Sequence, residues 1–112
     1  ELDSIVKDLN KILEIKKNVK EVYELVNIYE RISENLENIK SDYPNIDFDL
    51  DLALQINEVY SVKAYINSIF YNLISNAFKY RVTSRRLVIT IKTAETNDFI
   101  YIEFSDNGLG ID

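Results

Sequence analysis

A strict alternation between apolar and acidic residues constrains the fold more than any other feature of this sequence. Within residues 46–54, aspartate stands at positions 47, 49 and 51, and the alternate positions are all apolar: Ile46, Phe48, Leu50, Leu52 and Leu54. Side chains point to opposite faces of a β-strand in turn, so this pattern predicts a strand with one face in a core and one in solvent. The aspartates are therefore expected to face solvent rather than to bind a metal.

Two other stretches show the three- and four-residue spacing of apolar residues that is typical of amphipathic helices. The first runs from about Tyr29 to Lys40, with an apolar face of Ile32, Leu36 and Ile39. Residues 41–45 then break the chain. The second helix is predicted to run from Ser61, as its N-cap, to about Tyr80. Its apolar face comprises Ile66, Ile69, Phe70, Leu73, Ile74, Ala77 and Phe78.

Two further strands are predicted after the second helix. Leu87 to Thr93 and Phe99 to Ser105 are rich in β-branched and aromatic residues, which favour strands. The turn at residues 95–98 is short enough to join them as an antiparallel pair. The pattern as a whole predicts an α+β fold in which helices cover one face of a mixed sheet.

The beginning of the chain has a separate amphipathic pattern. Its apolar residues are Leu2, Ile5, Val6, Leu9, Ile12 and Leu13. This spacing predicts a helix from Leu2 to about Val19, with a stripe close to the a/d seam of a coiled coil. The stripe could pair with another chain or pack on its own domain, and two heptads do not decide between these alternatives.

Composition excludes several classes of function. The chain has no cysteine and no histidine, which excludes disulfides, thiolate nucleophiles, Ser-His-Asp triads and the commonest zinc sites. A net charge of -6 argues against a nucleic-acid-binding surface. The sequence has no apolar stretch of about 18 residues, the length that a membrane-spanning helix needs. We expect a cytoplasmic fragment of a larger protein, not itself embedded in a membrane.

One cluster of polar residues lies on the second predicted helix. Asn72, Asn76 and Lys79 are spaced to share one helical face, and Tyr80 follows directly. Carboxamide oxygens can bind magnesium, and a lysine can contact phosphate oxygens. The simpler interpretation is that these residues form a solvated outer face.

A second cluster follows the last predicted strand. Residues 106–112 read DNGLGID, which places the Asp106 carboxylate at a strand end and glycines at Gly108 and Gly110. A simple turn would explain Asp-Asn-Gly. The acidic spacing does not match an EF-hand, and the Gly-Lys-Ser/Thr ending of a P-loop is absent. An ionised aspartate at this place could accept hydrogen bonds from an exocyclic amine such as that of adenine.

The two clusters together resemble a known family. Residues 70–80, FYNLISNAFKY, strongly resemble the N box of histidine kinases, and residues 106–111, DNGLGI, resemble the first glycine box of the same GHKL ATPase superfamily. The order of the boxes and the two intervening strands also match. Residues 2–13 are similar to the end of the second dimerisation helix in PAS-linked sensor kinases. The resemblance covers nearly the whole chain.

The resemblance implies a fold and a division of the chain. The fold would be an incomplete two-layer α/β sandwich of the GHKL histidine-kinase type, preceded by the end of a dimerisation helix. Residues 1–20 would form that helix end and a linker, and residues 21–112 the N-terminal half of the ATP-binding domain. The implied partners are a second copy of the chain, bound through the N-terminal helix, and a response regulator.

The resemblance also implies roles for individual residues toward ATP and Mg. Asn76 would bind the magnesium ion that bridges the phosphates, with Asn72 beside it as a second candidate. Lys79 would contact phosphate oxygens, and Tyr80 would pack near the adenine or ribose. Asp106 would accept a hydrogen bond from the adenine amine. Gly108 and Gly110 would let the chain pass close to the nucleotide.

Asn72 also bears on the type of reaction. ATP-hydrolysing members of the superfamily carry a glutamate there to activate water, whereas a carboxamide has no useful basicity. The resemblance therefore implies an ATP-dependent protein-histidine kinase that passes the γ-phosphate to a histidine and then to a response-regulator aspartate. The acceptor histidine and the second half of the ATP domain are absent from this chain, so we expect no catalytic residue here and no activity from the chain alone. The alternatives are a degenerate kinase-like module that dimerises or binds partners without catalysis, and an unrelated α+β interaction domain.

Overall fold

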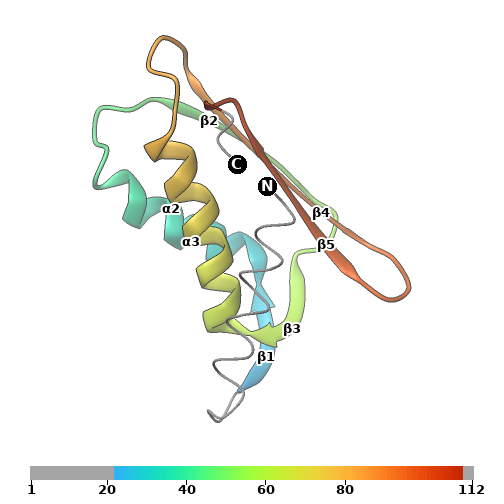
Figure 1. The fold of residues 1–112 in the computed structure, drawn as a ribbon. Helices are drawn as coiled ribbons and strands as arrows, with labels where there is room; N and C mark the ends of the chain where they lie inside the picture. Colours follow the sequence, from blue (N-terminus) through green and yellow to red (C-terminus); the bar gives the residue numbers. More distant parts are fainter. Residues whose placement is uncertain (1–21, 110–112) are drawn as a thin grey trace.

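The order of helices and strands in the computed structural model, which describes residues 22–109, matches the predicted α+β class (Figure 1). The elements are β1 (Tyr23–Asn27), α2 (Ile28–Lys40), β2 (Phe48–Leu54), β3 (Glu58–Val62), α3 (Lys63–Lys79), β4 (Leu87–Glu95) and β5 (Ile100–Asp106). The helix predicted over residues 2–19 lies outside the described residues. Neither of the two described helices has the length and apolarity needed to cross a lipid bilayer.

The strands form two sheets. The larger has the order β2-β4-β5, in which β2 and β4 are parallel and β4 and β5 antiparallel, as in the pairs Leu50↔Ile89 and Ile91↔Phe104. The smaller is an antiparallel pair of β1 and β3, with Leu25 opposite Tyr60. Figure 1 shows α2 and α3 side by side on one side of the larger sheet. The molecule thus has the predicted layer of helices on one face of a mixed sheet.

The core lies between the helices and this sheet. Alternate residues of β4 are buried, as expected for the central strand of a sheet with one covered face. The buried apolar residues come from both layers: Ile28, Ile32, Leu36, Ile39, Ile66, Phe70, Ile74, Ala77, Phe78, Leu87, Ile89 and Ile91. The ring of Phe78 lies 5.3 Å from that of Phe48 and 5.4 Å from that of Tyr43, which joins the end of α3 to β2 and the loop before it.

The alternation in residues 46–54 is confirmed. Within β2 the apolar side chains at Phe48, Leu50, Leu52 and Leu54 pack against the core, and the residues between them are exposed. Arg86 Nε lies 3.0 Å from Asp49 Oδ1, and Arg86 Nη1 lies 3.9 Å from Asp47 Oδ2. The aspartates therefore face solvent, where two of them pair with one arginine.

The predicted start of the second helix was wrong. Ser61 is not an N-cap, because it lies in β3 opposite Glu24 of β1. Helix α3 begins two residues later, and its N-cap Val62 makes no side-chain capping hydrogen bond. β1 and β3 were not predicted at all. Each is only five residues long, and each exists because of the other.

Candidate functional site

Helix α3 presents the first cluster to solvent. Asn72, Asn76 and Lys79 are exposed, whereas the opposite side of the helix is fixed in the core by Phe70, Ile74, Ala77 and Phe78. Neither carboxamide side chain has a hydrogen-bond partner within residues 22–109. Their oxygens are thus available to a ligand, and exposed carboxamide oxygens are suitable donors for magnesium.

The second cluster is a loop that is bonded to itself and to β4. Asp106, the last residue of β5, accepts a hydrogen bond at Oδ1 from Gly108 N–H at 2.8 Å. The side chain of Asn107 holds the loop on β4: Oδ1 accepts from Val88 N–H at 2.8 Å, and Nδ2 donates to Arg86 O at 2.8 Å. Asp106 is thereby held at the strand end, as predicted, and it is an exposed residue.

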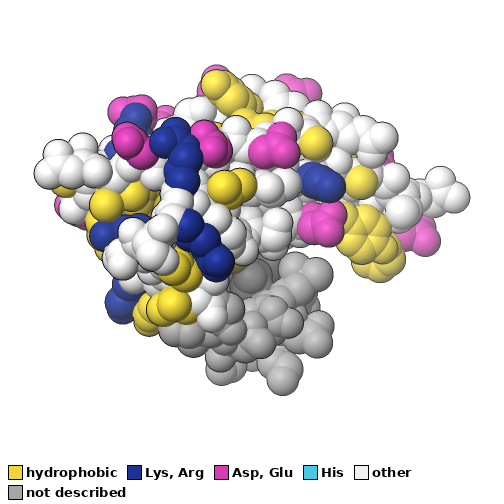
Figure 2. Space-filling model, turned by 90° about the horizontal axis from the view of Figure 1, so that it is seen from above, with side chains coloured by type: hydrophobic (Ala, Val, Ile, Leu, Met, Phe, Trp, Pro, Cys, Tyr) yellow, Lys and Arg dark blue, Asp and Glu magenta, His cyan; other side chains and the backbone are white. Residues whose placement is uncertain are grey.

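The structure brings the two clusters together where α3 ends. Tyr80 N–H donates to Asn76 O at 2.9 Å, and Leu109 N–H donates to Tyr80 O at 3.0 Å. A continuous set of backbone hydrogen bonds therefore links Asn76, Tyr80 and the loop. Figure 2 looks onto this end of the molecule and shows Lys and Arg side chains grouped there beside Asp and Glu.

Lys79 and the arginines that follow it in sequence each have a local contact. Lys79 Nζ lies 5.3 Å from the centre of the Tyr80 ring. The Arg85 guanidinium donates to Asn107 O at 2.6 Å from Nη2 and at 3.1 Å from Nε. Arg85 therefore holds the loop from outside. Neither Arg85 nor Asn107 was predicted in this role, and the only sequence signal was the position of Asn107 inside the Asp-Asn-Gly turn.

Gly108 is required by the protein itself. A Cβ atom at this position would lie 2.9 Å from Tyr80 O and 2.9 Å from Asp106 Oδ1. The glycine was predicted to let the chain pass close to a nucleotide, and the described contacts give a different reason, the close approach of the loop to the end of α3. Gly110 lies outside the described residues.

Gly108→Ala should lower the free energy of unfolding by about 1–3 kcal/mol, the usual cost of forcing an extra methyl group into a filled space. The methyl group would meet backbone atoms, which cannot rotate away. Chemical denaturation measures the change. Leu109→Ala is the control, because the Leu109 side chain is 58% exposed and its N–H is kept. Equal stability of Gly108→Ala and the unchanged chain would show that the loop is not docked against Tyr80.

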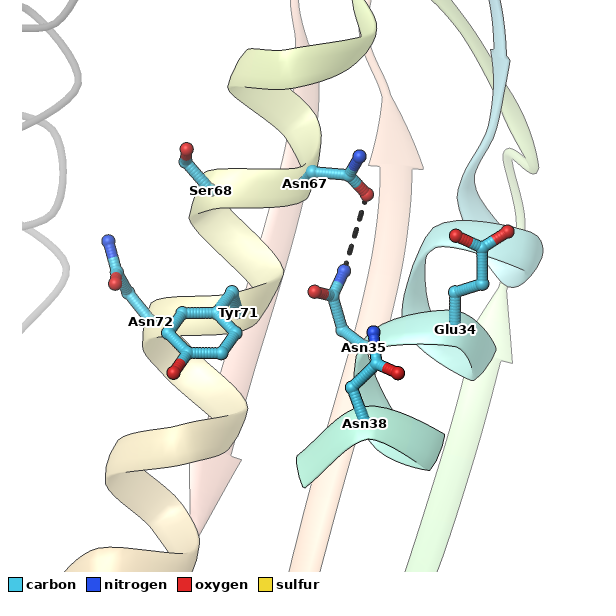
Figure 3. Close-up of a pocket in the computed structure, with 7 residues that line it drawn as sticks. All are labelled: Glu34, Asn35, Asn38, Asn67, Ser68, Tyr71 and Asn72. Carbon is cyan, nitrogen blue, oxygen red and sulfur yellow. Dashed lines mark hydrogen bonds between the residues drawn. The ribbon is translucent and has the colours of Figure 1, made fainter. Parts of the chain in front are cut away.

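A shallow polar groove runs between α2 and α3, next to Asn72 (Figure 3). It has a volume of about 250 Å³ and is lined by Glu34, Asn35, Asn38, Asn67, Ser68, Tyr71 and Asn72. Two of these residues, Glu34 and Asn67, accept hydrogen bonds from Arg31, of which only 3% is exposed. Arg31 and Asn35 share the buried stripe of α2 with Ile28, Ile32, Leu36 and Ile39. The sequence did contain a signal for Arg31 and Asn35. Both polar residues stand at positions where the helical spacing of α2 predicts buried apolar side chains.

Arg31 lowers the pKa of Glu34. The hydrogen bonds that its guanidinium donates, followed by its charge, hold the pKa of this carboxyl below its usual value of 4.5. Because the pKa of Glu34 is lower in the folded than in the unfolded protein, its interaction with Arg31 stabilises the fold at pH values above the unfolded-state pKa. That contribution is lost as the pH falls through the folded-state pKa.

Arg31→Met should raise the Glu34 pKa toward its usual value in an NMR titration, whereas Lys40→Met should not. An unchanged Glu34 pKa in Arg31→Met would contradict the pairing.

The sequence and the fold were each compared with those of known proteins. No protein-family model matches the sequence. The chain is 29% identical over 115 aligned residues to the signal transduction histidine-protein kinase ArlS of Staphylococcus aureus strain USA300, and the values for the strain COL protein are the same. The alignment covers 99% of this chain and 25% of the relative. The chain thus spans about a quarter of the length of the curated relatives it matches.

Solved structures show the same fold. The histidine kinase AdeS of Acinetobacter baumannii has a TM-score of 0.72 at 20% identity, over 99% of this chain and 54% of that one. The mycobacterial sensor histidine kinase MprB has a TM-score of 0.62 at 19% identity, over 81% of this chain and 59% of that one. The predicted resemblance to sensor histidine kinases is thereby confirmed. Their PAS-linked type stays a prediction.

Proposed function

We propose that this chain is the N-terminal part of the ATP-binding domain of a two-component sensor histidine kinase, preceded by the end of its dimerisation helix. The observation that carries the proposal is the hydrogen bond of 3.0 Å from Leu109 N–H to Tyr80 O, which joins the loop to the end of the helix. It forms a junction between the helix that carries the exposed Asn76 and the loop that follows the exposed Asp106. A nucleotide has a phosphate end and a base end, and this junction offers a partner for each.

Each exposed side chain has a role that fits its chemistry. Asn76 binds magnesium, with Asn72 as a second candidate, and Lys79 contacts phosphate oxygens. Bound magnesium would neutralise charge on the phosphates. Tyr80 packs near the ribose or adenine, and Asp106 accepts from the adenine amine. We also keep Gly108 and Gly110 as positions of close approach to the nucleotide.

The reaction is transfer to histidine rather than hydrolysis. The exposed carboxamide of Asn72 stands one helical turn before Asn76, and it cannot take a proton from water. Phosphoryl transfer depends mainly on positioning and on charge neutralisation, so a site without a general base is coherent. The whole protein would phosphorylate a histidine outside this chain and then a response-regulator aspartate. It would act as a cytoplasmic homodimer, and the chain alone would be inactive.

Asp106→Asn tests the base end of the site. Mg-ADP binding is measured by calorimetry on a protein extended C-terminally to the length of the histidine kinases. Asparagine can still accept from Gly108 N–H but replaces one carboxylate oxygen with a donor. Losing a hydrogen bond to a charged group should weaken binding roughly 10- to 100-fold. The control Asp98→Asn, in the exposed turn between β4 and β5, should leave affinity unchanged.

Two outcomes would overturn parts of the proposal. Unchanged affinity in Asp106→Asn would remove Asp106 from the base contact. No Mg-ADP binding by the folded, extended protein would favour a degenerate module that binds partners without catalysis.

A further inference from the structure

We infer that Arg31 is a positioning residue for the nucleotide site, acting through Asn67 to set the rotation of helix α3. The inference rests on the proposed function and adds to it a residue outside both sequence motifs. Arg31 lies on α2, and none of its hydrogen bonds reaches Asn72, Asn76 or the loop. Its effect on nucleotide binding must therefore pass through α3.

The Arg31 side chain is buried, and both of its Nη atoms donate hydrogen bonds. Its guanidinium forms two parallel bonds with Glu34, from Nη1 to Oε1 at 3.1 Å and from Nη2 to Oε2 at 3.0 Å. Nη1 also donates across the helix interface to Asn67 Oδ1 at 3.1 Å. Planar two-point pairing of this kind restricts orientation more tightly than a single contact, and a lysine ammonium cannot reproduce it.

Asn67 is the point where α2 holds α3. Its Oδ1 accepts from Arg31 and, at 3.3 Å, from Asn35 Nδ2, whose carboxamide is itself tied to Arg31 O at 2.7 Å. Two donors from one helix thus converge on one oxygen of the other. Figure 3 shows Asn67 pointing from α3 toward α2, whereas Asn72, on the same helix, points away.

The polar contact between Arg31 and Asn67 is better suited to fixing the orientation of α3 than to stabilising the fold. Only the Arg31 end of the Arg31–Glu34 ion pair is buried, since the Glu34 side chain is 68% exposed, and an apolar side chain at position 31 would bury surface without the cost of desolvating a charge. The apolar neighbours Ile28, Ile32, Ile66 and Phe70 supply the packing. The converging bonds on Asn67 add a directional constraint to this apolar packing, because hydrogen bonds require particular donor and acceptor angles.

Small rotations of α3 matter at the site. Side-chain atoms lie about 5–6 Å from a helix axis, so a rotation of about 20° would move those of Asn72 and Asn76 by on the order of 2 Å. Displacements of about 1 Å in a site can reduce its function by a factor of about 100. Asn67, Asn72 and Asn76 share one uninterrupted helix, so a constraint on the first is transmitted to the others.

The test compares four proteins of the extended length with the unchanged one: Arg31→Met, Arg31→Lys, Asn67→Ala and the double variant Arg31→Met with Asn67→Ala. Mg-ADP affinity is one readout. The other, which needs no nucleotide, is the NMR signal of the Asn72 and Asn76 carboxamides after isotope labelling of asparagine. Lys40→Met is the matched control, because Lys40 is a cation on the same helix whose ion pair in the described part of the chain is with Glu37.

Arg31→Met and Asn67→Ala should each weaken binding about 10-fold, as is usual for residues that orient a binding group. The double variant should bind Mg-ADP no more weakly than the weaker of the two single variants. Arg31→Lys should bind more tightly than Arg31→Met. The carboxamide NMR signals of Asn72 and Asn76 should shift most in the variants that lose most affinity. Wild-type affinity and unshifted signals in Arg31→Met would overturn the inference. If Arg31→Met fails to fold, Asn67→Ala and Arg31→Lys decide by the same criteria. If the unchanged protein binds no nucleotide, the proposed function fails and the signals alone decide the role of Arg31.

Discussion

Replacing Asn76 with alanine should weaken Mg-ADP binding by at least about 10- to 100-fold, the range found when residues that merely support a metal ligand are removed. The expectation follows from the exposed position of Asn76 and from the absence, within residues 22–109, of any protein partner for its carboxamide. Because no contact within residues 22–109 depends on this carboxamide, its removal should weaken binding and leave stability unchanged. Calorimetry on the extended protein measures the first, and chemical denaturation the second.

The controls separate a metal contact from a general effect. Asn76→Asp keeps an oxygen ligand and should lose less affinity than Asn76→Ala. Asn97→Ala makes the same chemical change in the exposed turn before β5 and should leave affinity unchanged. Binding by Asn76→Ala that is equal to that of the unchanged protein, with and without magnesium, would exclude Asn76 as the metal ligand.

Phe78→Ala should lower the free energy of unfolding by about 3–5 kcal/mol, the usual cost of deleting a buried aromatic ring. Phe78 is fully buried, and its ring contacts those of Tyr43 and Phe48. The three rings come from α3, β2 and the loop before β2, so the substitution removes a contact between these elements. A loss of this size is a large part of the stability of a small domain. Chemical denaturation of the chain provides the measurement.

Phe99→Ala is the matched control for this core substitution. The Phe99 side chain is 62% exposed, so the same truncation should change stability by less than about 0.5 kcal/mol. Nucleotide binding should also fall in Phe78→Ala, because Phe78 precedes Lys79 and Tyr80 on the last turn of α3. Similar losses of stability in the two variants would mean that the end of α3 is not packed on the sheet.

The helices and strands that were predicted correctly are those in which the spacing of apolar residues along the sequence indicates which face is buried. α2, α3, β2, β4 and β5 each bury one face against a large apolar layer, so a period of two or of three to four residues is visible in each. The two motifs of the candidate site were found for a related reason. Their residues are close in sequence within each motif, and their types match known chemistry.

The residues that organise the site around the motifs were missed. Arg85 contacts Asn107, and Arg31 contacts Asn67, across separations of 22 and 36 positions in the chain. No local pattern records which residues pair across such distances, although the place of Arg31 on the apolar stripe of α2 was a signal that it is buried. The reason for Gly108 also became clear only when the loop was seen against Tyr80 O.

The sequence by itself thus determined the α+β class, the faces of the main helices and strands, and the two candidate motifs, since each depends on neighbouring residues. The tertiary structure alone decided that β1 and β3 exist, that Ser61 lies in a strand instead of capping a helix, and that the two motifs meet at Tyr80. The physical reason is the same in each case. The backbone hydrogen bonds that create these features join segments far apart in the chain, and they form only when the whole fold brings those segments together.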